Sequence, residues 1–461
     1  MARGKKKETI LTPEEKLQQA LVPESEWPYK VSGNWLWVYI GAISNLYTGN
    51  SINEKTKKEK YCDQSEGLLY IATKDISFDG TINYETNVRI NDYEKFKIAP
   101  SNTPLLCIEG GSAGRKIGFV NQRVCFVNKL CAFVSEKTNP KFIYYYLQSQ
   151  CFLDQFNARK HGLIGGVSVN ELSAIPITLP PFPEQQRIVG RIESLFEKLD
   201  EAKEKVQAVV DSFEDRKAAI LHKAFTGELT EGWRKSKGIR KDSWDERELI
   251  SVLIDKPRNG YSPKPVNYKT PYKSMTLSAT SSGVFLPEFY KYIDEEIPND
   301  SYLWLKPGDI LMQRANSLDK VGTSALYTGK EHEFVYPDLI MKLQVNESAI
   351  PEYIAYYLKT DKVLRYLREN ATGTAGNMPK INQKVVSKTP VLIPTIEEQL
   401  EIVHSLDLLF DKEQTAKGTA NDVLNQIDTM KKSILARAFR GELGTNDPSD
   451  ESAEELLKRI L

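Results

Sequence analysis

The sequence has few of the residues that build metal sites and disulfide frameworks. Among its 461 residues are four histidines, scattered along the chain, and five cysteines. The cysteines all lie in the first third of the sequence: Cys62, Cys107, Cys125, Cys131 and Cys151. None forms a CxxC pair and no histidine stands at a metal-ligand spacing, which excludes the common zinc motifs. We expect buried, reduced thiols in a cytoplasmic protein, and no metal on this chain.

The sequence also lacks an excess of charge and any long apolar run. Lys and Arg number 62, as do Asp and Glu, so any nucleic-acid-binding face must be local. No apolar run approaches the roughly 18 residues of a membrane span. The basic start, MARGKKK, is followed by no apolar segment. The sequence therefore predicts neither a signal peptide nor an association with a membrane.

The motifs of catalysis are missing as well. The segment EGGSAGRKIG (109–118) lacks the GxxxxGK[ST] pattern of a phosphate loop, and the apolar runs on both sides of it favour a hairpin. No GxGxxG follows a strand-like run, and no acidic-x-Lys triplet follows Pro337-Asp338, so this pair is interpreted as a turn. The tetrapeptide of amino-methyltransferases is also missing. These absences predict a chain that is not an enzyme and binds no cofactor itself.

The sequence does contain a long internal repeat. Pro390–Leu443 aligns with Pro176–Leu229 without a gap, at a constant offset (390 − 176 = 214). Identical pairs include Glu184/Glu398, Gln185/Gln399, Ile188/Ile402, Phe196/Phe410, Lys217/Lys431, Ala224/Ala438, Phe225/Phe439 and Gly227/Gly441. Such a repeat is decisive for the fold, because each copy is one structural unit.

Each copy of the repeat has the apolar spacing of a long helix. Steps of three and four residues separate Ile188, Ile192, Leu195, Leu199, Ala202, Val206, Val209 and Phe213 in the first copy. The second copy has Ile402, Leu406, Leu409, Ala416, Ala420, Val423 and Ile427, with Glu413 as a polar exception. This spacing predicts one apolar seam per helix. A helix of about 40 residues would be about 60 Å long, which favours a strut paired with its repeat in a coiled coil.

A globular region with short strand-like runs precedes each predicted helix. The two regions share a plan: TGNSIN corresponds to NGYSPKP, IAPSNTPLLCIEGGS to LKPGDILMQRANS, and NPKFIYYYLQSQCFLDQF to IPEYIAYYLKTDKVLRYL. We therefore predict an α+β fold, a pseudo-twofold tandem duplication of two α/β domains separated by two long helices in an antiparallel coiled coil. The predicted parts are a tail with one short helix (1–24), globule 1 (25–182), spacer 1 (183–236), globule 2 (237–395), spacer 2 (396–444) and an acidic tail (445–461).

Three polar loops recur at matching places in the two globules. Gly permits close backbone approach, Arg and Lys meet phosphates or guanine, and Asn can read adenine. The candidate DNA-binding residues of globule 1 are Thr48, Gly49, Asn50, Ser51, Gly110, Gly111, Ser112, Arg115, Lys116 and Gly162. Those of globule 2 are Arg258, Asn259, Tyr261, Lys264, Arg314, Asn316, Lys320, Thr374, Asn377 and Lys380. Ordinary solvated turns use the same residue types, so only the recurrence favours function.

The repeated segments resemble the conserved regions of specificity subunits of type I restriction–modification systems. The resemblance rests on PPFPEQQRIV with AILHKAFTGEL in the first copy and PTIEEQLEIV with SILARAFRGELG in the second. It extends over roughly residues 25–444. It implies a non-catalytic subunit whose two target-recognition domains each read half of a bipartite site in double-stranded DNA, with the helices setting the distance between the halves.

The same resemblance implies the partners. Two methyltransferase subunits would carry S-adenosylmethionine, and two restriction subunits would use ATP and Mg. The matching segments AFTGEL and AFRGEL suggest methyltransferase-docking points at Phe225 and Phe439, while a plain packing role for these rings is the alternative. Two other functions stay open: a coiled-coil scaffold joining two protein-binding modules without DNA, and a self-sufficient nuclease or methyltransferase.

Overall fold

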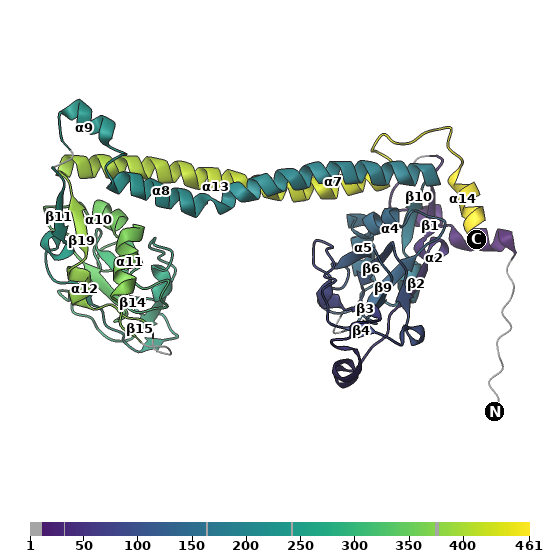
Figure 1. The fold of residues 1–461 in the computed structure, drawn as a ribbon, viewed down its shortest axis with the longest axis horizontal. Helices are drawn as coiled ribbons and strands as arrows, with labels where there is room; N and C mark the ends of the chain where they lie inside the picture. The colour runs from purple at the N-terminus through teal and green to yellow at the C-terminus, as the bar shows by residue number, and fades with distance from the viewer. Residues whose placement is uncertain (1–11, 32, 163–164, 241–242, 374–377) are drawn as a thin grey trace. The chain divides into compact units, whose positions relative to one another are not determined.

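The computed structural model describes residues 12–31, 33–162, 165–240, 243–373 and 378–461 (Figure 1). The chain forms two compact units. Unit 1 comprises Met1–Val206 together with Asp422–Leu461, and unit 2 comprises Gln207–Asn421. Each unit therefore combines one globular region with one part of each helical repeat. The linear domain boundaries predicted above follow the repeat, whereas the compact units cut both long helices.

Unit 1 holds most of the first helical repeat and the end of the second. Its helices are α1 (Pro13–Ala20), α2 (Ile40–Ile43), α3 (Glu54–Thr56), α4 (Pro140–Leu147), α5 (Gln150–Ala158), α6 (Val169–Ser173), most of α7 (Phe182–Asp211) and α14 (Ala453–Ile460). Its strands are β1 (Leu36–Tyr39), β2 (Asn45–Thr48), β3 (Leu68–Ile71), β4 (Arg89–Ile90), β5 (Ile98–Ala99), β6 (Thr103–Cys107), β7 (Ile117–Val120), β8 (Val124–Phe126), β9 (Leu130–Val134) and β10 (Pro176–Leu179).

Unit 2 is continuous in sequence. Its helices are α8 (Phe213–Phe225), α9 (Glu231–Lys237), α10 (Pro351–Tyr357), α11 (Asp361–Glu369), α12 (Gln383–Ser387) and the first part of α13 (Ile396–Phe439). Its strands are β11 (Asp245–Glu248), β12 (Arg258–Asn259), β13 (Pro265–Val266), β14 (Tyr272–Met275), β15 (Tyr290–Ile293), β16 (Ile310–Gln313), β17 (Ser324–Leu326), β18 (Ile340–Leu343) and β19 (Pro390–Ile393).

The two units share a sheet topology. A four-stranded sheet has the order β2-β9-β6-β7 in unit 1 and β12-β18-β16-β17 in unit 2. A separate antiparallel pair, β1-β10 or β11-β19, leads directly into α7 or α13. The remaining sheets differ: β4-β3-β8-β5 contains a parallel pair, while β13-β15-β14 is antiparallel throughout. The structure thus confirms the duplicated plan and locates the divergence in one sheet and the loops.

The helical repeats run antiparallel within each unit. In unit 1, Asp200 and Lys203 pair with Lys431 and Asp428, at 2.5 and 2.9 Å between charged atoms. In unit 2, Arg216 Nε lies 3.0 Å from Glu413 Oε2. Residue numbers rise along one helix as they fall along the other, which confirms the predicted antiparallel pairing. Glu413, the polar exception in the predicted seam, is explained by its ion pair with Arg216.

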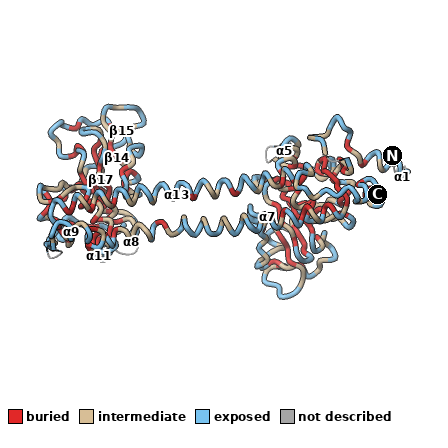
Figure 2. The backbone as a smooth tube through the Cα atoms, turned by 90° about the horizontal axis from the view of Figure 1, so that it is seen from above, coloured by how far each residue is buried: buried red, intermediate tan, exposed pale blue. Residues whose placement is uncertain are grey.

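The seam itself differs from the prediction at two positions. Val209 is 48% exposed, and Ala416 is exposed as well, so neither packs in the seam. The helix of the first repeat is interrupted at Ser212, after which Phe213 turns fully inward. Between Ile192 and Phe213 the described side chains are at most half-buried, as Figure 2 shows along α7. The spacing of apolar residues did not predict these features, because it assumes one uninterrupted helix with a constant period.

Other local expectations also needed correction. The run WLWVYIGAI, expected as a strand, is divided between β1 and α2, and the run at 142–156, expected as one helix, forms α4 and α5. The acidic segment after Gly444, expected as a tail, contains α14, whose Leu456 and Leu457 are buried in the core of unit 1. The short helix near the start is confirmed as α1, with the capping box of Thr12 and Glu15.

A glutamine fastens each long helix to its own globular region. Gln185 Oε1 accepts a hydrogen bond from the Asn139 amide at 2.9 Å, just before α4. Gln399 Oε1 accepts one from the Ile350 amide at 2.8 Å, just before α10. Both side chains are fully buried, and each also donates to a proline carbonyl preceding its helix. The repeated glutamine therefore fixes the direction in which each helix leaves its sheet.

Candidate nucleic-acid interface

The loop after β2 is shaped by a close backbone contact. The Asn50 amide donates to the Phe126 carbonyl at 2.9 Å, and a Cβ added to Gly49 would lie 1.9 Å from that oxygen. Asn50 Oδ1 accepts from the Lys97 amide at 2.6 Å. The side-chain oxygen of Asn50 is therefore already engaged within the fold. Thr48 ends β2 and Ser51 is exposed beside it.

Unit 2 repeats this contact at the matching place. The Tyr261 amide donates to the Tyr336 carbonyl at 3.0 Å, and a Cβ on Gly260 would lie 2.1 Å from that oxygen. The glycine is required here by the close approach of two backbones within the fold, a role that differs both from DNA contact and from the solvated turn that was the alternative. Tyr261 itself is 45% exposed, and Lys264 is exposed next to it.

The two residues of β12 differ in the contacts that their side chains make within the fold. The Arg258 guanidinium pairs with Asp255 and lies 5.4 Å from the centre of the Tyr302 ring. The Asn259 side-chain oxygen is buried without a hydrogen-bond partner among the described residues. Arg258 therefore remains a cation at the surface, whereas Asn259 points an unsatisfied acceptor inward.

The two glycine-rich loops of unit 1 lie against each other. The Gly110 amide donates to the Gly165 carbonyl at 3.2 Å, and the Val167 amide donates to the Ile108 carbonyl at 3.1 Å. Gly110 and Gly162 have φ of +86° and +80°, which side chains other than glycine adopt with strain. The predicted residues Gly110, Gly111, Ser112 and Gly162 are thus brought together on paired loops. Residues 163 and 164 lie outside the described chain.

Two cations of the first of these loops flank an exposed ring. Phe78 is 64% exposed, and the charged groups of Arg115 and Lys116 lie 5.3 and 5.2 Å from its ring centre. Arg115 also donates to the Gly111 carbonyl, and Lys116 donates to the Thr73 carbonyl at 3.1 Å. Sequence reasoning missed Phe78, because a lone aromatic residue in a turn carries no signal of its neighbours.

The corresponding loops of unit 2 are paired in the same way. The Ile381 amide donates to the Arg314 carbonyl at 2.8 Å, and the Asn316 amide donates to the Pro379 carbonyl at 3.4 Å. Lys380 forms an isolated antiparallel bridge with Ala315, in the loop after β16. The predicted residues Thr374 and Asn377 lie outside the described residues. The structure therefore unites Arg314, Asn316 and Lys380 on one edge of unit 2.

Contacts within unit 2 already use parts of these side chains. The Arg314 Nη1 atom donates to the Asp338 carbonyl at 3.4 Å, while its Nε is buried without a described partner. Asn316 donates to the buried Gln313 side chain at 2.7 Å, and Lys320 donates to the Ser281 carbonyl at 3.4 Å. Arg314 is therefore held beside the turn at Asp338 with hydrogen-bonding capacity left over.

Unit 1 also has a basic hollow of about 340 Å³ between α3 and β3. Its lining includes Lys57, Lys74 and Lys129, along with Tyr70 and Ile52. Glu54 and Glu109 offset part of this charge, at 3.7 Å from Lys57 and 4.0 Å from Lys129. Of these three lysines, only Lys57 belongs to the Lys-rich run NEKTKKEK. The other two lysines come from distant segments that the pairing of β3 with β8 brings together.

These loops offer backbone amides, lysines and arginines, the groups that contact phosphates and base edges. Within the described chain, no three His, Cys, Asp or Glu residues are grouped closely enough to hold a metal ion. Among the same residues, no helix is both long and apolar enough to cross a bilayer.

Phe225 and Phe439, predicted as docking residues, are both packed inside their units. Phe225 is 7% exposed and meets Tyr353 and Tyr357, with ring centres 5.4 and 4.9 Å apart. Phe439 is 1% exposed and meets Phe142 and Tyr146 at 5.1 and 5.2 Å. The packing role that was the alternative accounts for both rings.

Comparison with known proteins identifies the family. The model of the type I restriction modification DNA specificity domain matches residues 34–210 and again 242–426, well over half of the chain. The EcoKI specificity subunit of Escherichia coli is 27% identical over 66% of this chain and 65% of its own length. The StySPI subunit of Salmonella potsdam is 24% identical over 76% of each chain, and the EcoBI subunit of E. coli is 21% identical over 90% of this chain and 87% of its own.

Solved structures agree on the fold. A chain from a structural study of type I system assembly and conformational transition gives a TM-score of 0.69 at 19% identity, covering 90% of this chain and all of that one. The HsdS subunit of Thermoanaerobacter tengcongensis gives 0.56 at 19% identity, covering 91% of this chain and all of its own. Because the specificity-domain model matches twice and covers well over half of the sequence, the chain belongs to the family of type I restriction–modification specificity subunits, whose role is DNA recognition and not catalysis.

Proposed function

We propose that each globular region reads one half of a bipartite site in double-stranded DNA. The observation that carries this proposal is the contrast between the shared four-stranded sheet and the unlike loops on it. A common frame with different loops would present two different recognition surfaces in equivalent ways. Base contacts would come from the paired loops, with Arg314 and Asn316 in unit 2 and Arg115 in unit 1.

Phosphate contacts would come from the lysines. Lys57, Lys74 and Lys129 line one hollow, and such a cluster of ammonium groups suits the positioning of a DNA backbone. Their replacement by alanine should weaken binding about equally for all duplex sequences and lower the salt dependence of binding by roughly one phosphate for each lysine. A loss restricted to one DNA sequence would instead assign them to base reading.

The complex around this subunit is part of the proposal. Two methyltransferase subunits would bring S-adenosylmethionine and modify adenine in each half-site, and two restriction subunits would add ATP- and Mg-dependent cleavage in the cytoplasm. This chain would hold none of these cofactors. The exposed faces of α7, α8 and α13 would dock the methyltransferase subunits, because the opposite faces of these helices pack in the seam.

The decisive experiment is co-production of this chain with its methyltransferase subunit, followed by mapping of methylated adenines in the host genome. We expect one bipartite motif with a fixed spacer. A variant with Arg314→Ala, produced in the same way, serves as the test of half-site assignment. Absence of methylation together with a failure of the complex to bind any duplex would favour the coiled-coil scaffold. Methylation or cleavage by the purified chain alone would favour the self-sufficient enzyme.

A further inference from the structure

An exposed phenylalanine in unit 1 has surroundings that its packing does not explain. Among the described residues of this unit, no other phenylalanine, tyrosine or tryptophan is as exposed as Phe78, at 64%. One exposed apolar side chain is common on protein surfaces and carries no inference alone. The cations beside this ring, Arg115 and Lys116, have no carboxylate partner within the described chain. The fold therefore leaves an apolar ring and two uncompensated positive charges together at the surface.

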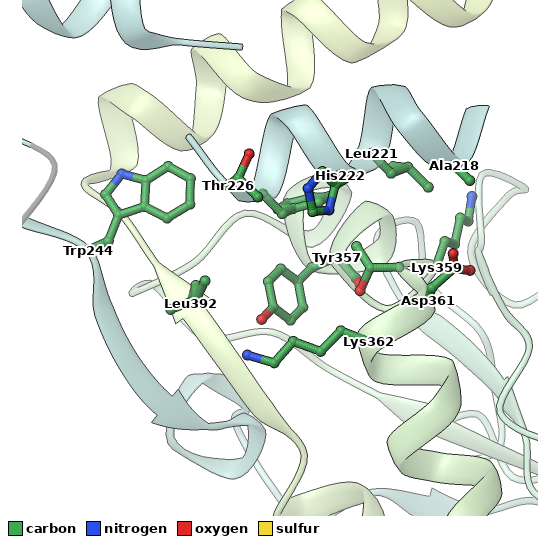
Figure 3. A pocket seen from close by; sticks show the side chains of 12 residues that line it. Ala218, Leu221, His222, Thr226, Trp244, Tyr357, Lys359, Asp361, Lys362 and Leu392 are labelled. Carbon is green, nitrogen blue, oxygen red and sulfur yellow. The ribbon is translucent and has the colours of Figure 1, made fainter. Parts of the chain in front are cut away.

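Other rings that lie at hollows of the two units take part in packing. Trp244 lines a cavity of about 550 Å³ in unit 2 (Figure 3). Its indole donates to Glu398, and Glu398 also pairs with Arg234, the cation next to that ring. Tyr29 lines the equivalent hollow of unit 1, and its hydroxyl donates to the last carbonyl of α13. Phe78, in contrast, belongs to none of the apolar cores of the described residues.

A tight hairpin carries Phe78 at its tip. Ile76 and Ile82 form an antiparallel bridge, and both pack on the core beside β7, where Ile76 is fully buried. Gly80 has a φ of +89°, and a Cβ added to it would lie 2.6 Å from the Tyr144 hydroxyl on α4. The hairpin is thus anchored to the sheet and to a helix. The ring is therefore held at a fixed place and does not fold away when it meets another molecule.

The hairpin begins beside the lysine-lined hollow of unit 1. Thr73 and Lys74, which line the hollow, lie directly before it in the chain. Lys116 donates to the Thr73 carbonyl at 3.1 Å, so this lysine joins the edge of the hollow to the ring of Phe78. With a DNA backbone in the hollow, the ring stands next to the duplex, where bases are the apolar surface that it can contact.

Unit 2 has no ring at the matching place. The turns Thr73–Asp75 and Leu277–Ala279 follow equivalent strands, β3 and β14. The residues after the second turn, 280–284, read TSSGV and contain no aromatic side chain. The exposed ring is therefore a feature of one recognition surface and not of the duplicated frame.

We propose that Phe78 is a wedge that enters one base step of the half-site read by unit 1 and stacks on a base. The proposal deepens the function proposed above and rests on it. Lys116 would meet a phosphate beside the opened step, while Arg115 would stay free to contact a base edge. Burial of the ring and the contact with the phosphate offset the cost of unstacking. Since pyrimidine–purine steps open most easily, the wedge would add a sequence preference without a hydrogen bond to a base.

The test measures stacking base by base. 2-Aminopurine, which fluoresces when it is unstacked, is placed in turn along the duplex identified by methylation mapping, and the full-length chain is used with its methyltransferase subunit. We expect one position, in one half-site only, to brighten with the wild type and with Phe78→Trp but not with Phe78→Ala. A target adenine extruded by the methyltransferase should brighten in every variant. Phe289→Ala, at the 41% exposed ring of unit 2, is the matched control and should keep the Phe78-dependent signal.

Affinity separates stacking from a contact with a thymine methyl group. Phe78→Ala should weaken the Kd for the recognised duplex about 5- to 100-fold, the range of one base stacked on an aromatic ring. A duplex with deoxyuridine in place of thymidine should bind the wild type unchanged. Thermal unfolding should give the same Tm for Phe78→Ala and the wild type, since the ring supports no core.

Two results would overturn the wedge. One is a duplex that brightens with Phe78→Ala as it does with the wild type. The other is a deoxyuridine duplex that loses as much affinity for the wild type as Phe78→Ala loses for the normal duplex, because the ring would then contact a thymine methyl group. A methylated motif that is not bipartite, with the Phe78-dependent signal retained, would instead refute only the function proposed above.

Discussion

A buried glutamate stands at the start of each long helix and meets a threonine that follows the other helical repeat. Glu398 accepts hydrogen bonds from Thr230 at 2.7 Å and from the Trp244 indole at 2.9 Å, and it pairs with Arg234. Glu184 accepts from Thr445 at 2.6 Å and pairs with Arg187 at 2.8 Å. Each contact lies within one unit, and all but the Glu184–Arg187 pair join segments that are distant in sequence.

The two glutamates differ in how well water can replace their partners. Arg234 is 6% exposed in its side chain, whereas Arg187 is 37% exposed. Glu398→Gln leaves a buried guanidinium without its carboxylate, so we expect a loss of about 3–5 kcal/mol in the free energy of unfolding of unit 2. Glu184→Gln, the matched variant in unit 1, should cost only about 1 kcal/mol, because Arg187 is more exposed and keeps its ion pair with Asp450. Denaturant unfolding measures both; equal losses would contradict the argument.

For single residues, the sequence predicts which positions matter but not which residues they contact. The repeat singled out Glu184, Gln185 and their equivalents, yet their hydrogen bonds reach segments tens to hundreds of positions away. Gly49 was predicted for close approach to DNA, and the structure shows that its missing side chain first admits the Phe126 carbonyl. Asn50 was predicted as a base reader, and its oxygen is engaged by Lys97. Local sequence cannot separate these roles, because both use the same residue types.

Among the elements, the long helices were the most predictable part. Spacing of three and four residues places the seam correctly at Ile188, Ile192, Ile402, Leu406 and Ile427, all of which are buried. It fails near Val209 and Ala416, where the pairing involves Arg216 and Glu413 instead of apolar contacts. The interruption at Ser212 has no proline or glycine to announce it. Periodicity therefore predicts an uninterrupted helix but not its local breaks.

The length of these helices should set the spacing of the recognised site. We expect that one heptad inserted after Val206 and another after Asn421, where both helices pass from one unit to the other, adds about 10 Å of helix. The unmethylated spacer of the recognised DNA should then lengthen by about three base pairs. Methylome sequencing of cells that produce the variant with its methyltransferase subunit measures this. A heptad inserted in one helix alone is the control, since it mismatches the seam. An unchanged spacer in the variant with both insertions would refute the proposal that helix length sets the spacing of the half-sites.

For the whole molecule, duplication was predictable and divergence was not. The matching segments identified a common plan, and the equivalent sheets β2-β9-β6-β7 and β12-β18-β16-β17 confirm it. The sheets β4-β3-β8-β5 and β13-β15-β14 share no such pattern in the sequence. Their strands are as short as two residues, and so short a strand carries little periodicity.

If each globular region reads its own half-site, a substitution in one region should affect only one half of the recognised DNA. Arg314→Ala should relax the sequence requirement in one half-site, at a cost of about 1–3 kcal/mol in binding, and leave the other half-site unchanged. Arg115→Ala is the matched variant in unit 1 and should affect the opposite half. Binding of duplexes randomised in each half, measured with the methyltransferase complex, distinguishes these outcomes. Equal weakening for every duplex would make Arg314 a phosphate contact.

Unit 1 is built from two stretches of the chain that are far apart in sequence, and this governs the order in which a newly made chain can fold. Unit 2 is complete once Asn421 has been synthesised, whereas unit 1 waits for Phe439, Leu456 and Leu457 to fill its core. At ~5–20 residues per second, the ribosome leaves the first globular region without these side chains for on the order of tens of seconds. A premature stop near the end of the gene would therefore damage the region made first, and the nascent N-terminal half is where a chaperone would be needed.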